Sequence, residues 1–112
     1  MKIICSKSEL LKKISIVIKA VPAKTTMPVL ECILIRAEGG EIRFTANDME
    51  LGIETVVEGV ILEVGQAALE AKLFSDIVRK LPEADVSIEA DAAGKAVISC
   101  EKAIFRITGR DA

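Results

Sequence analysis

The residues of this 112-residue sequence that are best suited to binding a ligand are cationic side chains. They recur on two predicted helices. With about 100° of rotation per residue, each helix turns an apolar stripe to one side and its cations to the other. These cations are Lys12, Lys19, Lys72 and Arg79, with Lys80 at the flank of the second helix. Mobile cations contact phosphates without reading bases, so such a face predicts salt-sensitive, sequence-independent contact with a nucleic-acid duplex.

A solvated helix face is the other interpretation of the same cations, and it remains open at this point. The 15 basic and 17 acidic residues leave a net charge of −2, so binding would depend on local clustering. Two features favour binding: the cations occupy corresponding places in two similar segments, and Lys24 follows directly after the first helix. Asp76 interrupts the basic stripe four residues from both Lys72 and Lys80, where we expect a surface ion pair.

Catalytic groups are scarce in this chain. It has no histidine, which removes the commonest general base and the Ser-His-Asp and Cys-His arrangements. Its glycines never form a phosphate-binding loop motif. Asp48, Glu50 and Glu54 could be considered a magnesium site, but they are spread over a turn and a strand, which disfavours it. We therefore predict a protein that is not an enzyme, with no metal and no cofactor.

Three cysteines, Cys5, Cys32 and Cys100, lie inside apolar runs and lack the C-x-x-C spacing of zinc and redox sites. We interpret them as buried, reduced thiols, which indicates a reducing cytoplasm. The apolar stretch at the N-terminus is too short for a signal peptide, and no run reaches membrane-spanning length. The expected location is cytoplasmic, without a membrane.

The same order of elements occurs twice: a strand, a helix and three strands. Ser6 and Glu9 have capping-box spacing, so the first helix begins there and ends before Pro22. The second helix covers residues 72–81 and ends before Pro82. We place the strands at residues 1–5, 29–37, 42–46 and 51–58 in the first copy, and at residues 67–69, 86–90, 95–100 and 103–108 in the second.

This duplication predicts the fold class. Two β-α-β-β-β repeats, roughly residues 1–60 and 66–110, would form one α+β domain whose two helices pack on one side of antiparallel sheet. The length suits one domain with a single core. Because Trp and Tyr are absent and Phe occurs three times, that core must be mainly aliphatic.

Several short motifs occur in a characteristic order. They are Leu10-Leu11-Lys12, Thr26-Met27-Pro28-Val29-Leu30, Asn47-Asp48-Met49-Glu50, Ala71-Lys72, Ile77-Val78-Arg79-Lys80-Leu81-Pro82 and Phe105-Arg106-Ile107. With the doubled layout, they resemble the N-terminal domain of the bacterial DNA polymerase III beta subunit, the sliding clamp. The resemblance covers the whole chain. It implies a DNA-clamp fold and a non-catalytic processivity factor in DNA replication, in which helices line a ring around duplex DNA.

The resemblance also implies an assembly. Residues 1–112 would be the first domain of a three-domain clamp, and two such chains would form a head-to-tail homodimer ring. The ring would tether the replicative polymerase without sequence specificity. In this family the pocket for the polymerase and the clamp loader lies in the later domains, so these partners are assigned no residue in this chain.

Particular residues take roles from the same resemblance. It implies DNA contact by Lys24, in the loop after the first helix, and by Lys72, at the start of the second. The helical-face argument adds Lys12, Lys19, Arg79 and Lys80. The last strand would join the partner subunit through Phe105 and Ile107, and an apolar edge strand is an association site in its own right. The remaining expected interface residues are Ile104, Leu73, Lys102 and Lys95.

A different class of function stays open as the alternative. The chain could be a non-enzymatic α+β protein-interaction domain that pairs with a partner through an exposed sheet edge. Its lysines would then only keep it soluble. The two interpretations differ in whether the parent gene encodes two more copies of this layout.

Overall fold

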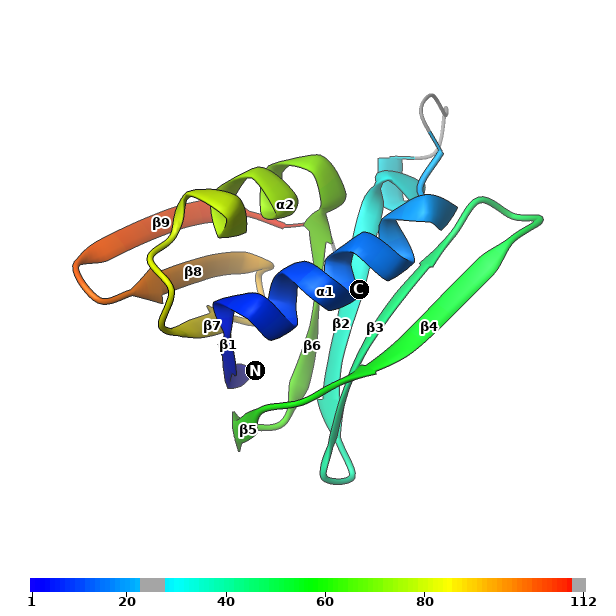
Figure 1. Ribbon diagram of the computed structural model, residues 1–112. Coiled ribbons are helices and arrows are strands. Elements are labelled where there is room, and N and C mark those ends of the chain that lie inside the picture. The colour runs from blue at the N-terminus through cyan, green and yellow to red at the C-terminus, as the bar shows by residue number, and fades with distance from the viewer. Residues whose placement is uncertain (23–27, 110–112) are drawn as a thin grey trace.

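The computed structural model describes residues 1–22 and 28–109 (Figure 1). The first copy comprises β1 (Lys2–Ser6), α1 (Lys7–Val17), β2 (Cys32–Glu38), β3 (Glu41–Asn47) and β4 (Gly52–Val57). Short 3-10 helices cover Ile18–Ala20 and Pro28–Glu31. After β5 (Val60–Glu63), the second copy comprises β6 (Gly65–Glu70), α2 (Ala71–Lys80), β7 (Asp85–Ala90), β8 (Lys95–Cys100) and β9 (Ala103–Thr108). The predicted α+β class and the doubled order of elements are confirmed.

The strands form two antiparallel sheets, with the orders β5-β1-β7-β8-β9 and β4-β3-β2-β6. The first strand of each copy pairs with the strands of the other copy. Ile3 of β1 lies opposite Ile88 of β7, and Leu69 of β6 lies opposite Ile33 of β2. Because each sheet takes strands from both copies, the two repeats form one interlocked unit.

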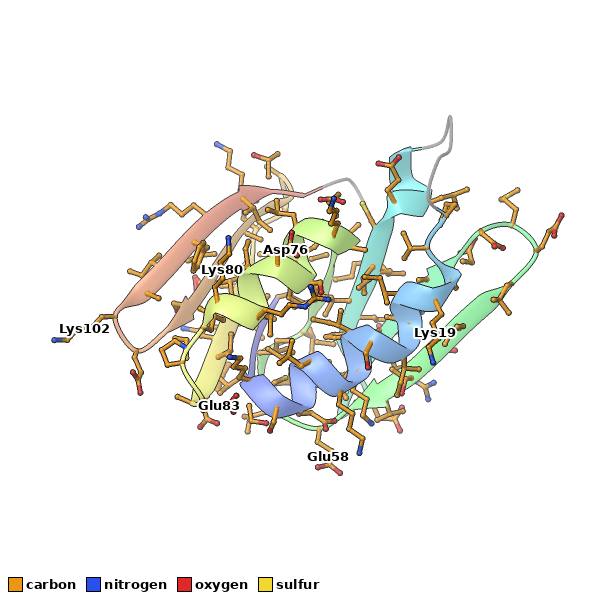
Figure 2. All side chains as sticks on the ribbon, turned by 45° about the horizontal axis from the view of Figure 1, so that its top comes forward. Lys19, Glu58, Asp76, Lys80, Glu83 and Lys102 are labelled. Carbon is orange, nitrogen blue, oxygen red and sulfur yellow. The ribbon has the colours of Figure 1, made fainter. Side chains whose placement is uncertain are left out.

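Both helices lie on the same side of the two sheets and pack against each other (Figures 1 and 2). They run in opposite directions, since the Lys7 ammonium at the start of α1 donates a hydrogen bond to the Arg79 carbonyl at the end of α2, at 3.1 Å. Their buried faces pack onto an aliphatic core that includes Ile3, Ile33, Ile35, Ile88 and Ile98. Phe44 of β3 meets Phe74 of α2 edge to face, with ring centroids 5.9 Å apart. The predicted aliphatic core is confirmed.

Strand β5 was not predicted. The chain crosses from the four-stranded to the five-stranded sheet between Val57 and Val60, and Gly59 lies at the crossing. A Cβ atom at Gly59 would lie 2.5 Å from the Ile4 carbonyl oxygen, so a side chain there would clash with the backbone. Only Ile61 of β5 is half-buried while the other three residues are exposed, so this edge strand lacks the alternation that reveals strands in a sequence.

The three cysteines and the Asp48 carboxylate, which the sequence offered as other reactive groups, have structural surroundings in the described part of the chain. Cys5, Cys32 and Cys100 are buried, reduced thiols, as predicted, and burial raises the pKa of Cys5 to about 12. Backbone N–H groups of Leu51 and Glu50 donate to the Asp48 carboxylate and lower its pKa. Over residues 1–22 and 28–109, no helix is long and apolar enough to cross a membrane.

Candidate nucleic-acid interface and open sheet edge

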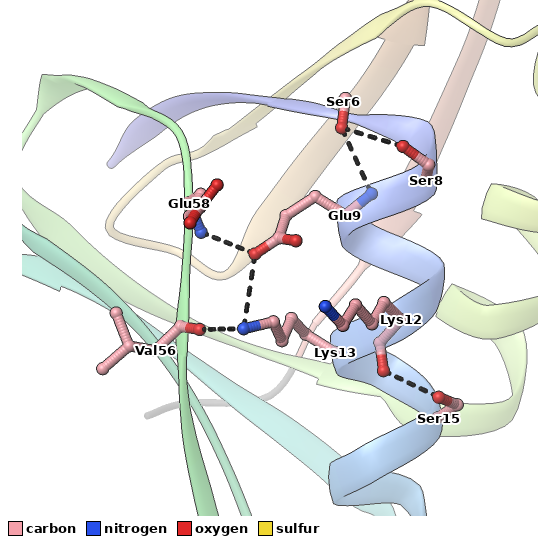
Figure 3. A network of polar contacts seen from close by, with 8 residues as sticks. All are labelled: Ser6, Ser8, Glu9, Lys12, Lys13, Ser15, Val56 and Glu58. Atoms are coloured by element: carbon pink, nitrogen blue, oxygen red, sulfur yellow. Dashed lines mark hydrogen bonds and ion pairs between the residues drawn. The ribbon is translucent and has the colours of Figure 1, made fainter.

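The start of α1 is held by a network of polar contacts that also orients its lysines (Figure 3). The Ser6 hydroxyl accepts a hydrogen bond from the Glu9 N–H at 3.1 Å, as the capping-box spacing predicted. In a capping box the Glu9 carboxylate would accept a hydrogen bond from the Ser6 N–H, but here it has other partners. It accepts a hydrogen bond from the Glu58 N–H at 2.8 Å and pairs with the Lys13 ammonium at 3.5 Å.

Neighbouring lysines of α1 therefore have different roles. Lys13 points toward the sheet, where its ammonium donates to the Val56 carbonyl at 2.8 Å and its side chain is 18% exposed. Lys12 lies on the exposed face, and its carbonyl accepts a hydrogen bond from the Ser15 hydroxyl at 2.7 Å. Lys19, in the 3-10 turn that follows, is exposed as well.

Helix α2 presents its cations from the same side of the molecule (Figure 2). The Glu70 carboxylate caps the helix by accepting hydrogen bonds from the Lys72 N–H at 3.3 Å and the Leu73 N–H at 3.0 Å. Three cations of the helix are exposed, namely Lys72, Arg79 and Lys80. We refer to the exposed cations Lys12, Lys19, Lys72, Arg79 and Lys80 as the basic helix face.

Asp76 pairs with Arg79, at 3.7 Å between Oδ1 and Nη1. The predicted ion pair with Lys72 or Lys80 is wrong. Residues three apart on a helix are neighbours as much as residues four apart, and the long guanidinium side chain reaches the carboxylate from there. In the described part of the chain, no ion pair involves Lys12, Lys19, Lys72 or Lys80.

Of the six predicted DNA-contacting residues, the structure places four on the two adjacent helices and Lys19 in the 3-10 turn that follows α1. The sixth, Lys24, lies outside the described residues. Lys7 and Lys13, which no sequence signal separated from the other lysines, bind backbone carbonyls at 3.1 Å and 2.8 Å. Exposed cations beside each other can contact several phosphates of one duplex, whereas Lys7 and Lys13 would first have to leave these partners.

The predicted interface residues surround β9, which forms one edge of the five-stranded sheet. Phe105 and Ile107 lie opposite Ile98 and Ala96 of β8, are half-buried and pack against the core. Ile104 lies opposite Ser99 on the other face of the sheet and is 54% exposed. The apolar residues of this strand are therefore divided between two faces.

The other expected interface residues lie on different elements. Lys102 precedes β9 in the turn, and Lys95 begins β8 opposite Thr108. Leu73 is 42% exposed on α2, although it shares a helical face with Phe74 and Ile77, which predicts burial. Ser75 is buried instead, so the buried stripe of the helix is rotated from Leu73 toward Ser75.

The carboxylates considered for a magnesium site do not converge. Glu54 pairs with Arg43 at 3.1 Å, whereas Asp48 caps the turn before β4. No group of three or more His, Cys, Asp or Glu residues that could hold a metal ion occurs within residues 1–22 and 28–109. The charged features of the described chain are therefore its basic helix face and scattered surface ion pairs.

Comparison with known proteins gives consistent matches along the chain. Residues 1–112 match the family described as DNA polymerase III beta subunit, N-terminal domain. The chain is 37% identical to the beta sliding clamp of Synechocystis, with all of this chain and 31% of that protein covered. It is also 37% identical to the beta sliding clamp of Bacillus subtilis, with 100% and 32% covered.

Solved structures agree with these relatives. A crystal structure described as a DNA polymerase III beta subunit from Eubacterium rectale superimposes with a TM-score of 0.97 at 63% identity, covering 99% of this chain and 30% of that one. The DNA polymerase sliding clamp of Bacillus subtilis gives a TM-score of 0.93 at 34% identity, covering 99% and 31%. The chain therefore spans about a third of the length of the proteins it matches.

Proposed function

The chain belongs to the DNA polymerase III beta subunit family, whose N-terminal domain it matches from residue 1 to residue 112, and from this we propose that it is the first domain of a three-domain sliding clamp. The clamp is a ring around duplex DNA that holds the replicative polymerase at its template. It acts in the cytoplasm as a processivity factor and catalyses no reaction itself.

The basic helix face is the observation that carries this proposal. Two antiparallel helices lie side by side, and together with the 3-10 turn after α1 they carry five exposed cations. Four of these cations have no ion-pair partner among residues 1–22 and 28–109. In the proposed ring this face lines the hole and contacts phosphates, which would hold the duplex without choosing a sequence. Lys24 is proposed to add a contact from the loop beyond α1.

The open edge at β9 supports a second part of the proposal. Pairing of β9 with a strand of another subunit would extend the five-stranded sheet and cover Ile104, Phe105 and Ile107. Such a contact joins two different surfaces, so it is heterologous and can close a head-to-tail ring. Lys95 and Lys102 lie in the hairpin of β8 and β9, and with Leu73 on α2 they are proposed to complete the interface.

Binding of the polymerase and the clamp loader is assigned to the later domains. The basic helix face is proposed to bind DNA, and the β9 edge is proposed to bind the partner subunit. Polymerase binding should therefore survive substitutions in the basic helix face of the full-length protein.

The test uses the full-length protein loaded on nicked circular DNA. Topological linkage predicts retention on the circle through a high-salt wash and release once the circle is cut, because a ring slides off a free end. Equal retention on circular and linear templates would reject the ring. The exposed β9 edge would then favour a protein-interaction domain, and capture of a strand-forming peptide at this edge would identify it.

A further inference from the structure

We propose that Asp76 tunes the grip of the basic helix face on DNA by competing with phosphates for the Arg79 guanidinium. This inference rests on the proposed function, since it assumes that the basic helix face meets the duplex. It goes further by assigning a restraining role to an acidic residue within a surface whose other charged members attract DNA.

The geometry of the pair makes such competition possible. Arg79 Nη1 lies 3.7 Å from Asp76 Oδ1, and the two side chains are 66% and 46% exposed. An exposed pair at this distance is weak and exchanges readily. A phosphate that approaches the helices would therefore meet a guanidinium that is already shared, yet free to change partners.

The exchange of Asp76 for a phosphate at the Arg79 guanidinium matters because of where Arg79 lies in the fold. The Lys7 ammonium donates to the Arg79 carbonyl at 3.1 Å and pairs with Glu83 at 3.6 Å, and the Lys7 side chain is only 13% exposed. This contact holds the backbone of Arg79 against the start of α1. Arg79 therefore lies where the end of α2 meets the start of α1.

Asp76 is also the exposed carboxylate of these two helices. The sequences of α1 and α2 contain one other acidic residue, Glu9, whose side chain is 14% exposed and engaged with Lys13 and Glu58. Asp76, whose side chain is 46% exposed, thus places a negative charge on the helix that carries the exposed Lys72 and Lys80. Figure 2 labels Asp76 and Lys80 on α2. A ring that slides needs contacts that form and break easily, and this carboxylate weakens the strongest phosphate ligand on the helix.

The experiment measures DNA affinity of the full-length protein against salt concentration, using the isosteric substitution Asp76→Asn. Release of Arg79 to one more phosphate should steepen the slope of log K against log salt by about 0.9 for each subunit whose Arg79 contacts the duplex. Between 50 and 200 mM salt, each such contact corresponds to an additional loss of affinity of about 3.5-fold. The substituted ring should also leave linear DNA more slowly, because its contacts last longer.

A double-mutant cycle identifies Arg79 as the residue through which Asp76 acts. Arg79→Gln should cost less affinity in the wild-type protein than in the Asp76→Asn protein, where the guanidinium is released. Lys80→Gln is the matched control, because this neighbouring exposed lysine has no ion pair in the described chain, and its cost should be the same in both backgrounds.

Two results would overturn the inference alone: an unchanged salt slope in Asp76→Asn, or an equal cost of Arg79→Gln in both backgrounds while Lys72→Gln still weakens DNA binding. If Lys72→Gln and Lys80→Gln also leave the salt slope unchanged, the basic helix face does not meet DNA. Both the proposed function of this face and the role of Asp76 would then be rejected.

Discussion

The Glu9 carboxylate accepts a hydrogen bond from the backbone N–H of Glu58 at 2.8 Å, which joins the first turn of α1 to the point where the chain leaves the four-stranded sheet (Figure 3). We expect Glu9→Ala to lower the free energy of unfolding by about 1–3 kcal/mol, because it removes the acceptor of a hydrogen bond and the partner of Lys13. Urea denaturation of the domain measures this change. Glu83→Ala is the control, since Glu83 is 74% exposed and its pair with Lys7 should be worth less than about 1 kcal/mol. Equal losses in the two variants would contradict the structural role of Glu9.

Gly59 should tolerate no side chain. In Gly59→Ala the new Cβ would meet the Ile4 carbonyl oxygen and the Cys5 sulfur at 2.5 and 2.6 Å, so β4 or β5 would have to shift. We expect a loss of about 1–3 kcal/mol in the free energy of unfolding, as for other overpacked sites. Gly52→Ala serves as the comparison, because its Cβ would meet only the Asn47 Cβ, at 3.8 Å. A Gly59→Ala protein as stable as Gly52→Ala would disprove the close approach.

Substitution of the exposed Lys12 and substitution of the hydrogen-bonded Lys13 should have different effects on DNA binding and stability. Lys12→Gln together with Lys72→Gln should weaken DNA binding of the full-length protein and reduce its salt slope by about 0.9 for each phosphate that is no longer neutralised. Lys13→Gln should instead lower thermal stability and leave the slope unchanged, because its ammonium binds Val56 and Glu9. Salt titrations of binding to a short duplex decide this, and a slope reduced equally by Lys13→Gln would argue against the division.

The proposed DNA contact of Lys24 can be tested with the same assay. Lys24→Glu combined with Lys72→Glu should weaken DNA binding and lower its salt dependence, since both changes place a negative charge against phosphates. Lys2→Glu on β1, where Lys2 pairs with Glu89 at 3.3 Å, is the control for a single charge reversal away from the helices and is compared with Lys72→Glu alone. An unchanged slope would remove Lys24 and Lys72 from the DNA-facing surface.

Removal of apolar side chains from β9 should separate the subunits of the full-length protein. Phe105→Ala with Ile107→Ala should shift the dimer toward monomer in sedimentation velocity, because the proposed joint loses its apolar packing. Both side chains also pack partly against the core, so circular dichroism must confirm that the variant is folded. Ile104→Ala, on the opposite face of the strand, tests whether both faces take part. A dimer that persists in all of these folded variants would place the interface elsewhere.

Because the Cys5 thiol is buried, we expect the free energy of unfolding to fall at alkaline pH. Burial raises its pKa to about 12, above the value of 9.0 for an exposed thiol. Between these values the unfolded chain loses a proton that the folded chain keeps, so stability is complete below pH 9 and falls as pH rises, by at most about 1.4 kcal/mol per pH unit. Denaturation midpoints from pH 8 to 10.5 should fall less steeply in Cys5→Ala than in the wild type. Parallel midpoint curves would contradict a buried neutral thiol.

The sequence by itself determined the local elements of this protein. Both predicted helices form before their prolines, although α1 ends at Val17 and continues only as a 3-10 turn to Ala20. Strands β8 and β9 have the predicted bounds, whereas the strand predicted from residue 29 begins at Cys32, after a 3-10 helix. The exposure of Lys12, Lys19 and Lys72 also followed from helical periodicity. These features depend on residues a few positions apart, so a local pattern is sufficient to predict them.

Only the tertiary structure decided how these elements combine. The exchange of β1 and β6 between the repeats, the crossing at Gly59 and the division between Lys12 and Lys13 all depend on segments far apart in the chain. The partner of Asp76 was decided by side-chain geometry among cations three and four residues away. The periodicity of a helix or strand predicts which face a side chain occupies. Its contact partners depend on which distant segments pack against that face, and only the tertiary structure determines these.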